Sequence, residues 1–572
     1  MTPWPSSFRR AARRLPEPIQ LLLKRGDAAL RHDDWAGAVR RLRLREQAYL
    51  DRTTQENGNR PDRKDLLFFS FQQVPPWLEV EYSLAAALRL RGHRVDGILC
   101  DGLLPLCEMN LGRRERPACS VCAGWLTRYE EAFGFSFSRL TRFLSHEDLE
   151  LAEREVASIP DHGLTSLAVD GVDVGRLARR ELQRYSRGFV FEPAEDPAYR
   201  RWLVSAVLLV RLAGRLLDRK RPDIVVTSSG RTLPSACLCT VAGLRGTHVV
   251  TWDTEPTHAD GLVFSHNDSA VLIPLDNAWR TVSHCPLTDD QKRALQEFLR
   301  RWERSEITPY PYNPEPLEDH DSIRCELGLR PSAPLVVAFA NSAWDMAAVD
   351  RDVGFGSMFE WLFALVDYAT AHPEIDLVIR AHPSETNVSP DLRSRTPVGE
   401  EIVRRHGPLP SSIRVVEGTS RISSYALADM AHVVSVYASR IGLEVAVRGK
   451  RPWLAGETTY RGKGFTCDLR SQEDMIGLLD AATFENTLPA AAITFAERFA
   501  YLWFFRYVTR APLLRPSKPP FALETFRQLA EGGDPVIDSL CYALATGAPF
   551  VDLSKRASPS PGVRARRRQS AG

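Results

Sequence analysis

A cationic side chain and an imidazole follow directly after an apolar run, in the segment LVIRAHPSE at 377–385. The run Leu377–Ile379 predicts a buried strand, and Arg380 and His382 come next. Ligands of open α/β sheets bind at the carboxyl ends of the strands. Pro383 restricts the residue before it to extended backbone and so holds the imidazole in one place. The segment therefore predicts a ligand site, the alternative being an ordinary polar end of a strand.

A second apolar run leads into a serine, a glycine and a glutamate, in VVSVYASRIGLEVAVRGK at 433–450. We expect a helix to begin near Ser439, a good N-cap residue, with Gly442 and Glu444 in its first turns. The free N–H groups at a helix start suit a phosphate, and a glycine lets a ligand approach the backbone. Glu444 could accept hydrogen bonds from sugar hydroxyls. Alone this is a plain strand–helix unit, but two such units in one domain favour a nucleotide or sugar-phosphate cleft.

Four cysteines fall close together with the spacing C-x6-C-x11-C-x2-C, at Cys100, Cys107, Cys119 and Cys122. Four thiolates can bind zinc tetrahedrally, and C-x2-C is a common half-site. An iron–sulfur cluster uses the same ligands with tighter spacing, and unmetallated thiols are the third reading. Because four protein ligands leave no open position, a zinc ion here would be structural, and we expect no cofactor to be required for catalysis.

The charge balance excludes one class of function. The chain has 572 residues, of which 74 are basic and 72 acidic, so a general nucleic-acid binder is not expected. Arginines gather at 9–43 and 564–568. Such ends could make peripheral contact with the inner face of a membrane, although solvated extensions are commoner. The start of the sequence lacks an apolar signal region, and the scattered cysteines favour a cytoplasmic location.

Strand and helix patterns alternate along two long stretches, which is typical of doubly wound α/β domains. We expect two Rossmann-like domains facing a cleft, with a helical extension before them and a helix that returns after them. The predicted parts are a basic helical extension at 1–60, an N-terminal domain with the four-cysteine loop at 66–304, a linker at 305–330, a C-terminal domain at 331–485, C-terminal helices packing back on the N-terminal domain at 486–550, and a disordered tail at 555–572.

Four segments, in order, resemble the capsule polysaccharide biosynthesis family, whose members include transferases of 3-deoxy-manno-octulosonic acid (Kdo) with the GT-B fold. They are VVAFANSAWD at 336–345, RAHPSE at 380–385, SVYASRIGLEVAVRGK at 435–450 and YRGKGFTCD at 460–468. The resemblance covers 330–510 well and 66–300 more weakly. It implies a nucleotide-sugar donor in the C-terminal domain and a glycan or lipid-linked acceptor at the N-terminal domain.

The resemblance also implies roles for single residues. His382, together with Ser439 and the Gly442 turn, would hold the donor phosphate. Arg380 would add a charge-assisted contact, and Glu444 would bind donor hydroxyls. Many GT-B enzymes carry a second glutamate eight residues after the first, where this chain has Pro452. The Ser-Ser or Ser-Thr pair of related CMP-dependent enzymes is also absent, so a CMP-linked donor is one option among several.

Two carboxylates compete for the acid/base role. The strand 248–252 runs into TWDTEPTH, which would deliver Asp253 to the cleft from the N-terminal half. Asp345 lies just beyond the first strand of the C-terminal domain. A carboxylate at either place could take the proton of an acceptor hydroxyl. For Asp253 the alternative is loop capping.

These observations favour a glycosyltransferase that builds a surface or capsular polysaccharide of a bacterial cell. A polyol-phosphate transferase of the teichoic-acid type has a similar fold and His-Pro motif, but it forms a phosphodiester. A third reading is a non-catalytic GT-B-like protein that binds a glycan or serves as a scaffold at the membrane.

Overall fold

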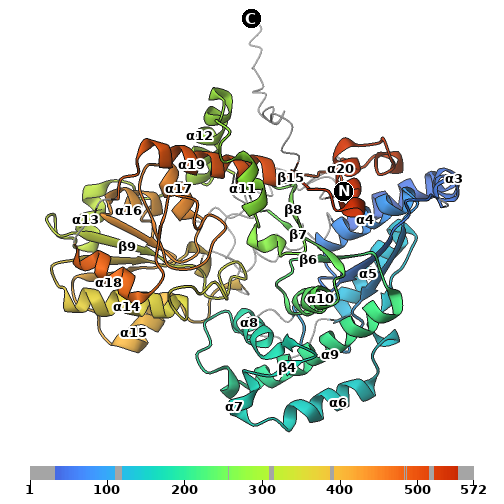
Figure 1. Ribbon diagram of the computed structural model, residues 1–572, viewed down its shortest axis with the longest axis horizontal. Coiled ribbons are helices and arrows are strands. Elements are labelled where there is room, and N and C mark those ends of the chain that lie inside the picture. Colours follow the sequence, from blue (N-terminus) through green and yellow to red (C-terminus); the bar gives the residue numbers. More distant parts are fainter. Residues whose placement is uncertain are drawn as a thin grey trace, which may run out of the picture.

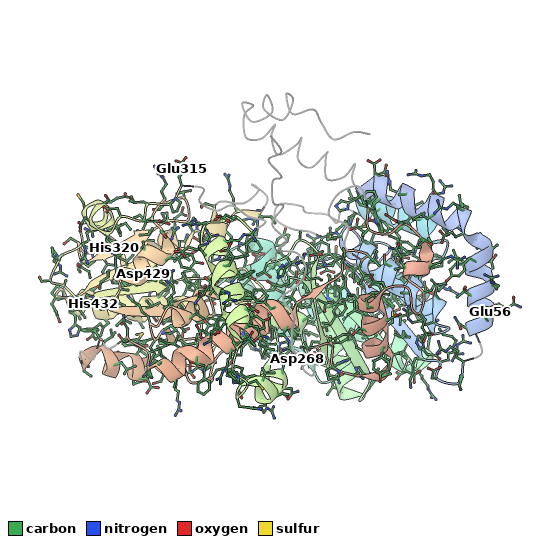
Figure 2. The ribbon with its side chains drawn as sticks, turned by 90° about the horizontal axis from the view of Figure 1, so that it is seen from above. Glu56, Asp268, Glu315, His320, Asp429 and His432 are labelled. Atoms are coloured by element: carbon green, nitrogen blue, oxygen red, sulfur yellow. The ribbon has the colours of Figure 1, made fainter. Side chains whose placement is uncertain are left out.

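A computed structural model describes residues 32–58, 60–109, 119–255, 257–307, 315–386, 392–481, 484, 486–514 and 521–551. Two α/β halves lie side by side, each built around one sheet (Figure 1). Figure 2 shows the same arrangement from above. His320, Asp429 and His432 lie in the C-terminal half, and Glu56 lies at the opposite end of the molecule.

The sheet of the N-terminal half has the order β15-β8-β7-β6-β1-β2-β3. Its strands are β1 Asp65–Ser70, β2 Arg94–Leu99, β3 Ser138–Arg139, β6 Ile224–Ser228, β7 His248–Thr254, β8 Gly261–His266 and β15 Thr509–Arg510. Strands β7, β6, β1, β2 and β3 are parallel to one another, whereas β8 is antiparallel to β7 and β15 is antiparallel to β8. The parallel part has the doubly wound order, with its switch point between β1 and β6.

Helices cover both faces of this sheet. Helices α4 Trp77–Leu90 and α5 Cys119–Phe133 pack on one face, and α9 Pro197–Lys220 and α10 Leu233–Leu244 pack on the other. The half also contains α3 Gln47–Asn57, α6 His146–Ala157, α7 Asp161–Leu164, α8 Val174–Ser186 and a small hairpin of β4 Ala168–Val169 and β5 Val172–Asp173. Helices α11 Asp276–Val282 and α12 Asp289–Glu303 follow, and their buried residues Trp279, Leu295 and Phe298 belong to the core of the C-terminal half. Because both faces are covered, β1 and β6 are buried along almost their whole length.

Helix α9 explains the most apolar run of the sequence. Asp196 caps it by accepting from the Ala198 N–H, and Pro197 occupies its first position. Two arginines interrupt the apolar run, and both pair with carboxylates of α6: Arg211 with Glu155, and Arg215 with Asp148. Helix α9 is thus buried against α6, α8 and α10. Within the described residues, no helix is both long and apolar enough to cross a membrane.

The sheet of the C-terminal half has the order β11-β10-β9-β12-β13-β14, and every neighbouring pair is parallel. Its strands are β9 Leu335–Phe339, β10 Asp376–Arg380, β11 Ile413–Val416, β12 Val433–Val436, β13 Trp453–Leu454 and β14 Cys467–Asp468. Its helices are α13 His320–Leu327, α14 Met358–Ala371, α15 Val398–His406, α16 Ser424–Met430, α17 Ile441–Val447 and α18 Gln472–Asp480. The switch point lies between β9 and β12, as in a Rossmann fold.

The chain then returns to the N-terminal half. Helix α19, Ala490–Tyr501, packs on α17 and α12 and continues as a π-helix over Leu502–Tyr507. Figure 1 shows α19 crossing between the two halves. Strand β15 then pairs with β8, and α20, Pro535–Thr546, packs on α4. Two doubly wound halves joined by a returning helix confirm the predicted GT-B-like α/β fold.

Two predicted parts look different in the structure. Part of the predicted linker forms α13, which buries Ile323 in the core of the C-terminal half. Within the predicted N-terminal extension, Trp35 is buried against Tyr129 and Phe133 of α5, so this stretch belongs to the core of the N-terminal half. Residues 1–31 and the predicted tail at 555–572 lie outside the described residues.

Candidate active site

A cleft of about 730 Å³ opens between the halves at the carboxyl ends of their parallel strands. The loops after β9, β10 and β12 form one wall, and those after β1, β6 and β7 form the other. Both topological switch points therefore face the same space. Predicted site residues that line it are Asp253, Asp345, Arg380, His382, Ser439 and Glu444. The structure thus brings together residues from four segments, one in the N-terminal half and three in the C-terminal half.

The backbone that follows His382 holds its imidazole. Nδ1 accepts from the Ser384 N–H at 3.1 Å and lies 2.6 Å from Ser384 Oγ. Burial, with repulsion from Arg380 and Arg440, lowers the pKa of His382 to about 4. The ring is therefore neutral at pH 7, and because Nδ1 is an acceptor, its proton sits on Nε2. His382 can act as a neutral hydrogen-bond donor in the cleft, but not as a cation.

Arg380 joins the ends of two strands. Its guanidinium donates to the carbonyls of Val416, at 3.4 Å, and Glu417, and Nε lies 3.4 Å from Ser424 Oγ. Burial lowers its pKa to about 10, so the group stays charged at neutral pH. The side chain is committed to the β10–β11 edge. If Arg380 acts on a phosphate as predicted, it acts mainly through its positive charge, because its guanidinium already donates to protein carbonyls.

The helix predicted to begin near Ser439 is α17, which begins at Ile441 and is only seven residues long. Its N-cap residue is Arg440, without a side-chain cap bond, so the N-cap role predicted for Ser439 is wrong. The Ser439 carbonyl instead accepts from the Gly442 N–H, at 3.2 Å, and from Tyr460 Oη, at 2.5 Å. Ser439 lines the cleft as part of a tight turn, so the argument from a helix N-terminus does not apply there.

Gly442 serves packing. A Cβ atom at this position would lie 2.5 Å from Tyr460 Oη and 3.0 Å from Val436 Cγ2. Its missing side chain makes room for Tyr460, which is fully buried and bonds to the Ser439 carbonyl. Gly442 is not among the residues that line the cleft. The predicted close approach of a ligand to Gly442 is therefore wrong.

Substituting Gly442 tests this packing. We expect Gly442→Ala to displace Tyr460 and to lower the free energy of unfolding by about 1–3 kcal/mol, as overpacking does. Gly477→Ala is the matched control, since no atom lies within 4 Å of the new methyl group in α18. An alanine in that helix should be neutral or stabilising. Urea unfolding measures the free energy of unfolding of both variants. Equal values for Gly442→Ala and Gly477→Ala would contradict the packing role of Gly442.

Glu444 is firmly held with its carboxylate at the cleft. It is 5 % exposed, Oε2 accepts from Tyr425 Oη at 2.6 Å, and Oε1 accepts from Arg440 Nε at 2.9 Å. The Arg440 guanidinium lies 3.8 Å from the centroid of the Trp302 ring, which belongs to α12. Each carboxylate oxygen has further lone pairs. Glu444 can therefore accept additional hydrogen bonds from a ligand in a fixed direction.

The two candidate bases stand on opposite sides of the cleft. Asp253 is half-buried near the end of β7, where Oδ1 accepts from the Thr254 N–H at 2.6 Å. Asp345 lies in the loop after β9, and its Oδ1 accepts from the Ala347 N–H at 2.9 Å. The Asp345 side chain is exposed to the cleft. The protein on both sides of the cleft nevertheless limits its hydration, and this desolvation raises its pKa. A raised pKa makes a carboxylate a better general base at neutral pH.

Glu385, beside the His-Pro step, is fully buried. Its carboxyl group accepts from the Val398 N–H at 3.3 Å. Burial raises its pKa to about 8, and the nearby Glu417 adds to the rise. Glu385 is therefore protonated in the folded chain at neutral pH. The stabilisation from this proton is complete below about pH 4.5 and is lost as the pH rises through 8, because only the unfolded chain ionises in that window.

Glu385→Gln should remove this pH dependence. We expect the free energy of unfolding of the variant, relative to the native chain, to rise by about 1.4 kcal/mol per pH unit between pH 5 and pH 7.5. Glu326→Gln, at an exposed position of α13, is the control. Unfolding curves at three pH values measure the difference. A difference that stays constant with pH would show that Glu385 is ionised in the fold.

Sequence reasoning missed several groups that line the cleft. On the N-terminal wall these are Gln72, Trp77, Arg184, Ser229 and Thr232, and on the C-terminal wall Arg351, Tyr425 and Arg440. Ser229 and Thr232 follow β6 in a run of polar residues, a strand-end signal like the one that marked His382. Arg184 lies within α8, and nothing in the sequence shows that this helix faces the cleft.

The four cysteines all lie within the described residues. Gly102 lies beside two of them: its N–H donates to Cys100 Sγ at 3.5 Å, and a Cβ atom at this glycine would lie 3.4 Å from Cys119 Sγ. Burial raises the pKa of the Cys100 thiol to about 12. In the described part of the chain, no group of three or more His, Cys, Asp or Glu residues is arranged to hold a metal ion. The zinc site stays a prediction.

No protein-family model and no curated protein matches the chain. Among solved structures it is similar to a KpsC beta Kdo 2,4 transferase of Thermosulfurimonas dismutans, with 14% identity, 48% of this chain and 79% of that chain covered, and a TM-score of 0.31. It is also similar to a UDP-GlcNAc 2-epimerase of Neisseria meningitidis bound to UDP-GlcNAc (12% identity, 76% and 97% covered, TM-score 0.23). A spinosyn rhamnosyltransferase, SpnG, complexed with thymidine diphosphate is a third (14%, 76% and 98%, TM-score 0.22). Likenesses at these scores carry no argument about activity, and the fold follows from the strand order of this chain.

Proposed function

We propose that this chain is a glycosyltransferase that moves a sugar from a nucleotide-sugar donor to a surface or capsular polysaccharide acceptor. The observation that carries the proposal is the convergence of the residues at the strand ends of both halves on one cleft of about 730 Å³. One wall offers a fixed glutamate and a neutral imidazole donor. The two aspartates that could take a proton stand on opposite sides.

In the proposed complex the donor lies on the C-terminal wall. Glu444 accepts hydrogen bonds from donor hydroxyls. The Nε2–H of His382 donates to a phosphate oxygen, and the charge of Arg380 acts on the same group at short range. The phosphate gains negative charge as the bond to the sugar breaks, so fixed donors aimed at it stabilise the transition state more than the ground state.

The acceptor hydroxyl attacks the anomeric carbon from the N-terminal side. Its proton passes to a carboxylate, its oxygen forms the new glycosidic bond, and the bond from the anomeric carbon to the phosphate oxygen breaks, so that the nucleotide leaves with the electron pair. We assign the proton acceptor to Asp345, because its raised pKa suits a base and its side chain is exposed to the cleft. Asp253 is the competing candidate.

Binding and product analysis test the proposal. We expect one of the CMP-, UDP- or CDP-linked sugars to raise the unfolding temperature. At 100 times its Kd, the bound donor should add about 2.7 kcal/mol to the free energy of unfolding. Turnover of that donor should yield a glycosidic bond. A phosphodiester product would identify a polyol-phosphate transferase instead. No stabilisation by any donor would favour the scaffold reading.

We further propose that the enzyme works in the cytoplasm, in peripheral contact with the inner face of the membrane. The support is the arginine content of 9–43 and 564–568. Flotation with vesicles that contain phosphatidylserine, but not with neutral vesicles, is the expected result. Equal recovery with both would remove this part of the proposal.

A further inference from the structure

The loop that carries Asp345 belongs to the C-terminal half by sequence, but the N-terminal half holds its middle. Both ends of the loop are fixed to the C-terminal half. Near its start, Asn341 Oδ1 accepts from the Ala438 N–H at 3.0 Å. Further on, Arg351 Nε donates to the Glu457 carbonyl at 2.8 Å, and Asp352 accepts from Tyr437 Oη.

The middle of the loop is one tight turn. The Asp345 carbonyl accepts from the N–H groups of Ala348, at 2.8 Å, and Val349, at 2.9 Å. Arg231, in the loop between β6 and α10, reaches across the cleft to this turn. Its Nε donates to the Met346 carbonyl at 3.1 Å, and Nη2 donates to the Val349 carbonyl. A residue of the N-terminal half thus binds the same turn that presents Asp345.

Asp350, the next residue, is surrounded by arginines of α8. Arg176 Nε lies 3.3 Å from it, Arg179 Nη2 3.4 Å and Arg180 Nη1 3.7 Å. These arginines stand at positions i, i+3 and i+4, which share one face of a helix. The Asp350 side chain is only 2 % exposed, and its backbone has a φ of +55°, a left-handed conformation that Asp tolerates better than most residues.

Other contacts lie beside this cluster. Phe191 stacks on Phe363 of α14 at a centroid distance of 6.4 Å, and Phe189 packs on Phe359 at 5.2 Å. The Arg395 N–H donates to the Arg187 carbonyl at 3.0 Å. Figure 1 shows α8 next to the C-terminal half, on the side of the cleft away from α19. The halves therefore meet along α19 and again at α8.

We propose that Asp350 and the arginines of α8 form an interdomain clasp that keeps the cleft closed and positions Asp345 over it. Opening of the halves would separate Asp350 from all three arginines and break ion pairs that are stronger in this desolvated interface than in water. Closure and the placement of Asp345 are thereby linked. Asp350 is a positioning residue, since it acts through the turn of Asp345. Its effect on turnover rests on the proposed function, whereas its effect on closure does not.

Distance measurements on the full chain test the clasp without any substrate. Leu151 on α6 and Val403 on α15 are both about half exposed. These two helices belong to different halves and lie on the same side of the molecule as α8 (Figure 1). Each is replaced by p-acetylphenylalanine and spin-labelled, which avoids the native cysteines. We expect a narrow distribution of label distances in the native chain, and a longer and broader one in Asp350→Asn.

Two further variants complete the test. Arg176→Gln with Arg179→Gln removes the exposed part of the clasp and should lengthen the same distance, even if Asp350→Asn fails to fold. Asp161→Asn removes an exposed aspartate that pairs with Arg200 on the surface, and it should change nothing. Unchanged distances in both clasp variants would overturn the proposal.

Activity supplies the second readout once a donor is known. Asp350→Asn should lower kcat by about 10- to 100-fold with donor KM unchanged, because a small displacement of Asp345 is enough to slow proton transfer. Asp350→Glu should recover part of that loss. An unchanged kcat in Asp350→Asn would overturn the positioning role. Absence of turnover in the native chain would instead count against the proposed function and leave the distance result standing.

Discussion

Asp345→Asn is expected to lower kcat by about 100- to 10,000-fold, which is the range that general bases contribute. Asparagine keeps the size of the side chain and can still accept from the Ala347 N–H, so the turn should persist. Donor affinity should stay within about twofold of the native value, because the groups proposed to bind the donor lie elsewhere on the wall. Steady-state kinetics with the donor found by thermal shift measure both quantities.

The dependence of kcat on pH is a second test of Asp345 as the general base. The walls of the cleft raise the pKa of Asp345 above its ordinary value of 3.8. The rate should therefore fall on the acid side as this carboxylate gains a proton, and the fall should begin at a higher pH than for an ordinary aspartate. In Asp345→Asn the acid limb should disappear from the residual activity.

Asp253→Asn separates the two candidates. Asp253 accepts from the Thr254 N–H beside it, which is what a capping residue does. If Asp345 is the base, Asp253→Asn should cost less than about tenfold in kcat. A large loss in Asp253→Asn with little loss in Asp345→Asn would move the role to the N-terminal half.

The strands of the C-terminal half could be predicted because both faces of the sheet are covered. The strand predicted at Leu377–Ile379 lies within β10, Asp376–Arg380, which is buried along its whole length. A buried parallel strand is a short run of apolar residues, and the side chains at its end are the ones that turn polar. This is why strand ends led to His382, Ser439 and Asp345, which all line the cleft.

What each side chain contacts there could not be predicted. Arg380 looked available for a phosphate, but it donates to the carbonyls of Val416 and Glu417, 36 and 37 residues further along the chain. Gly442 looked like a place where a ligand approaches, but Tyr460 fills the space. In both cases a partner distant in sequence sets the role, and a local pattern holds no information about that partner.

The clasp shows the same limit more strongly. Asp350 reads as an ordinary polar loop residue, and Arg176, Arg179 and Arg180 read as the solvated face of a helix. The pairs that Arg176 and Arg179 form with Asp350 span 174 and 171 positions. The antiparallel strand β8 was also missed, since its pairing with β15 joins Gly261 to Arg510 at the far end of the chain. Contacts between distant segments follow from how the two halves dock.

Glu444→Gln is expected to weaken donor binding by about 10- to 100-fold, because a hydrogen bond to a charged group contributes about 1.5–3 kcal/mol. The glutamine keeps the shape of the side chain but loses the charge that Arg440 pairs with, and its NH₂ group cannot accept from a hydroxyl. Donor Kd, by calorimetry or by displacement of a bound nucleotide, is the measurement. kcat at saturating donor should change much less.

Two further variants separate donor binding by Glu444 from the contacts that hold its side chain in place. Tyr425→Phe removes the 2.6 Å hydrogen bond to Oε2 while keeping the ring, so it should weaken donor binding by only a few fold. Asp429→Asn removes an exposed partner of Arg448 on the same half and should leave Kd unchanged. If Glu444→Gln lowered the unfolding temperature but left donor Kd at the native value, Glu444 would be part of the support of the cleft alone. The donor would then have to be bound by the turn at Ser439 and by His382, without a carboxylate for its hydroxyls.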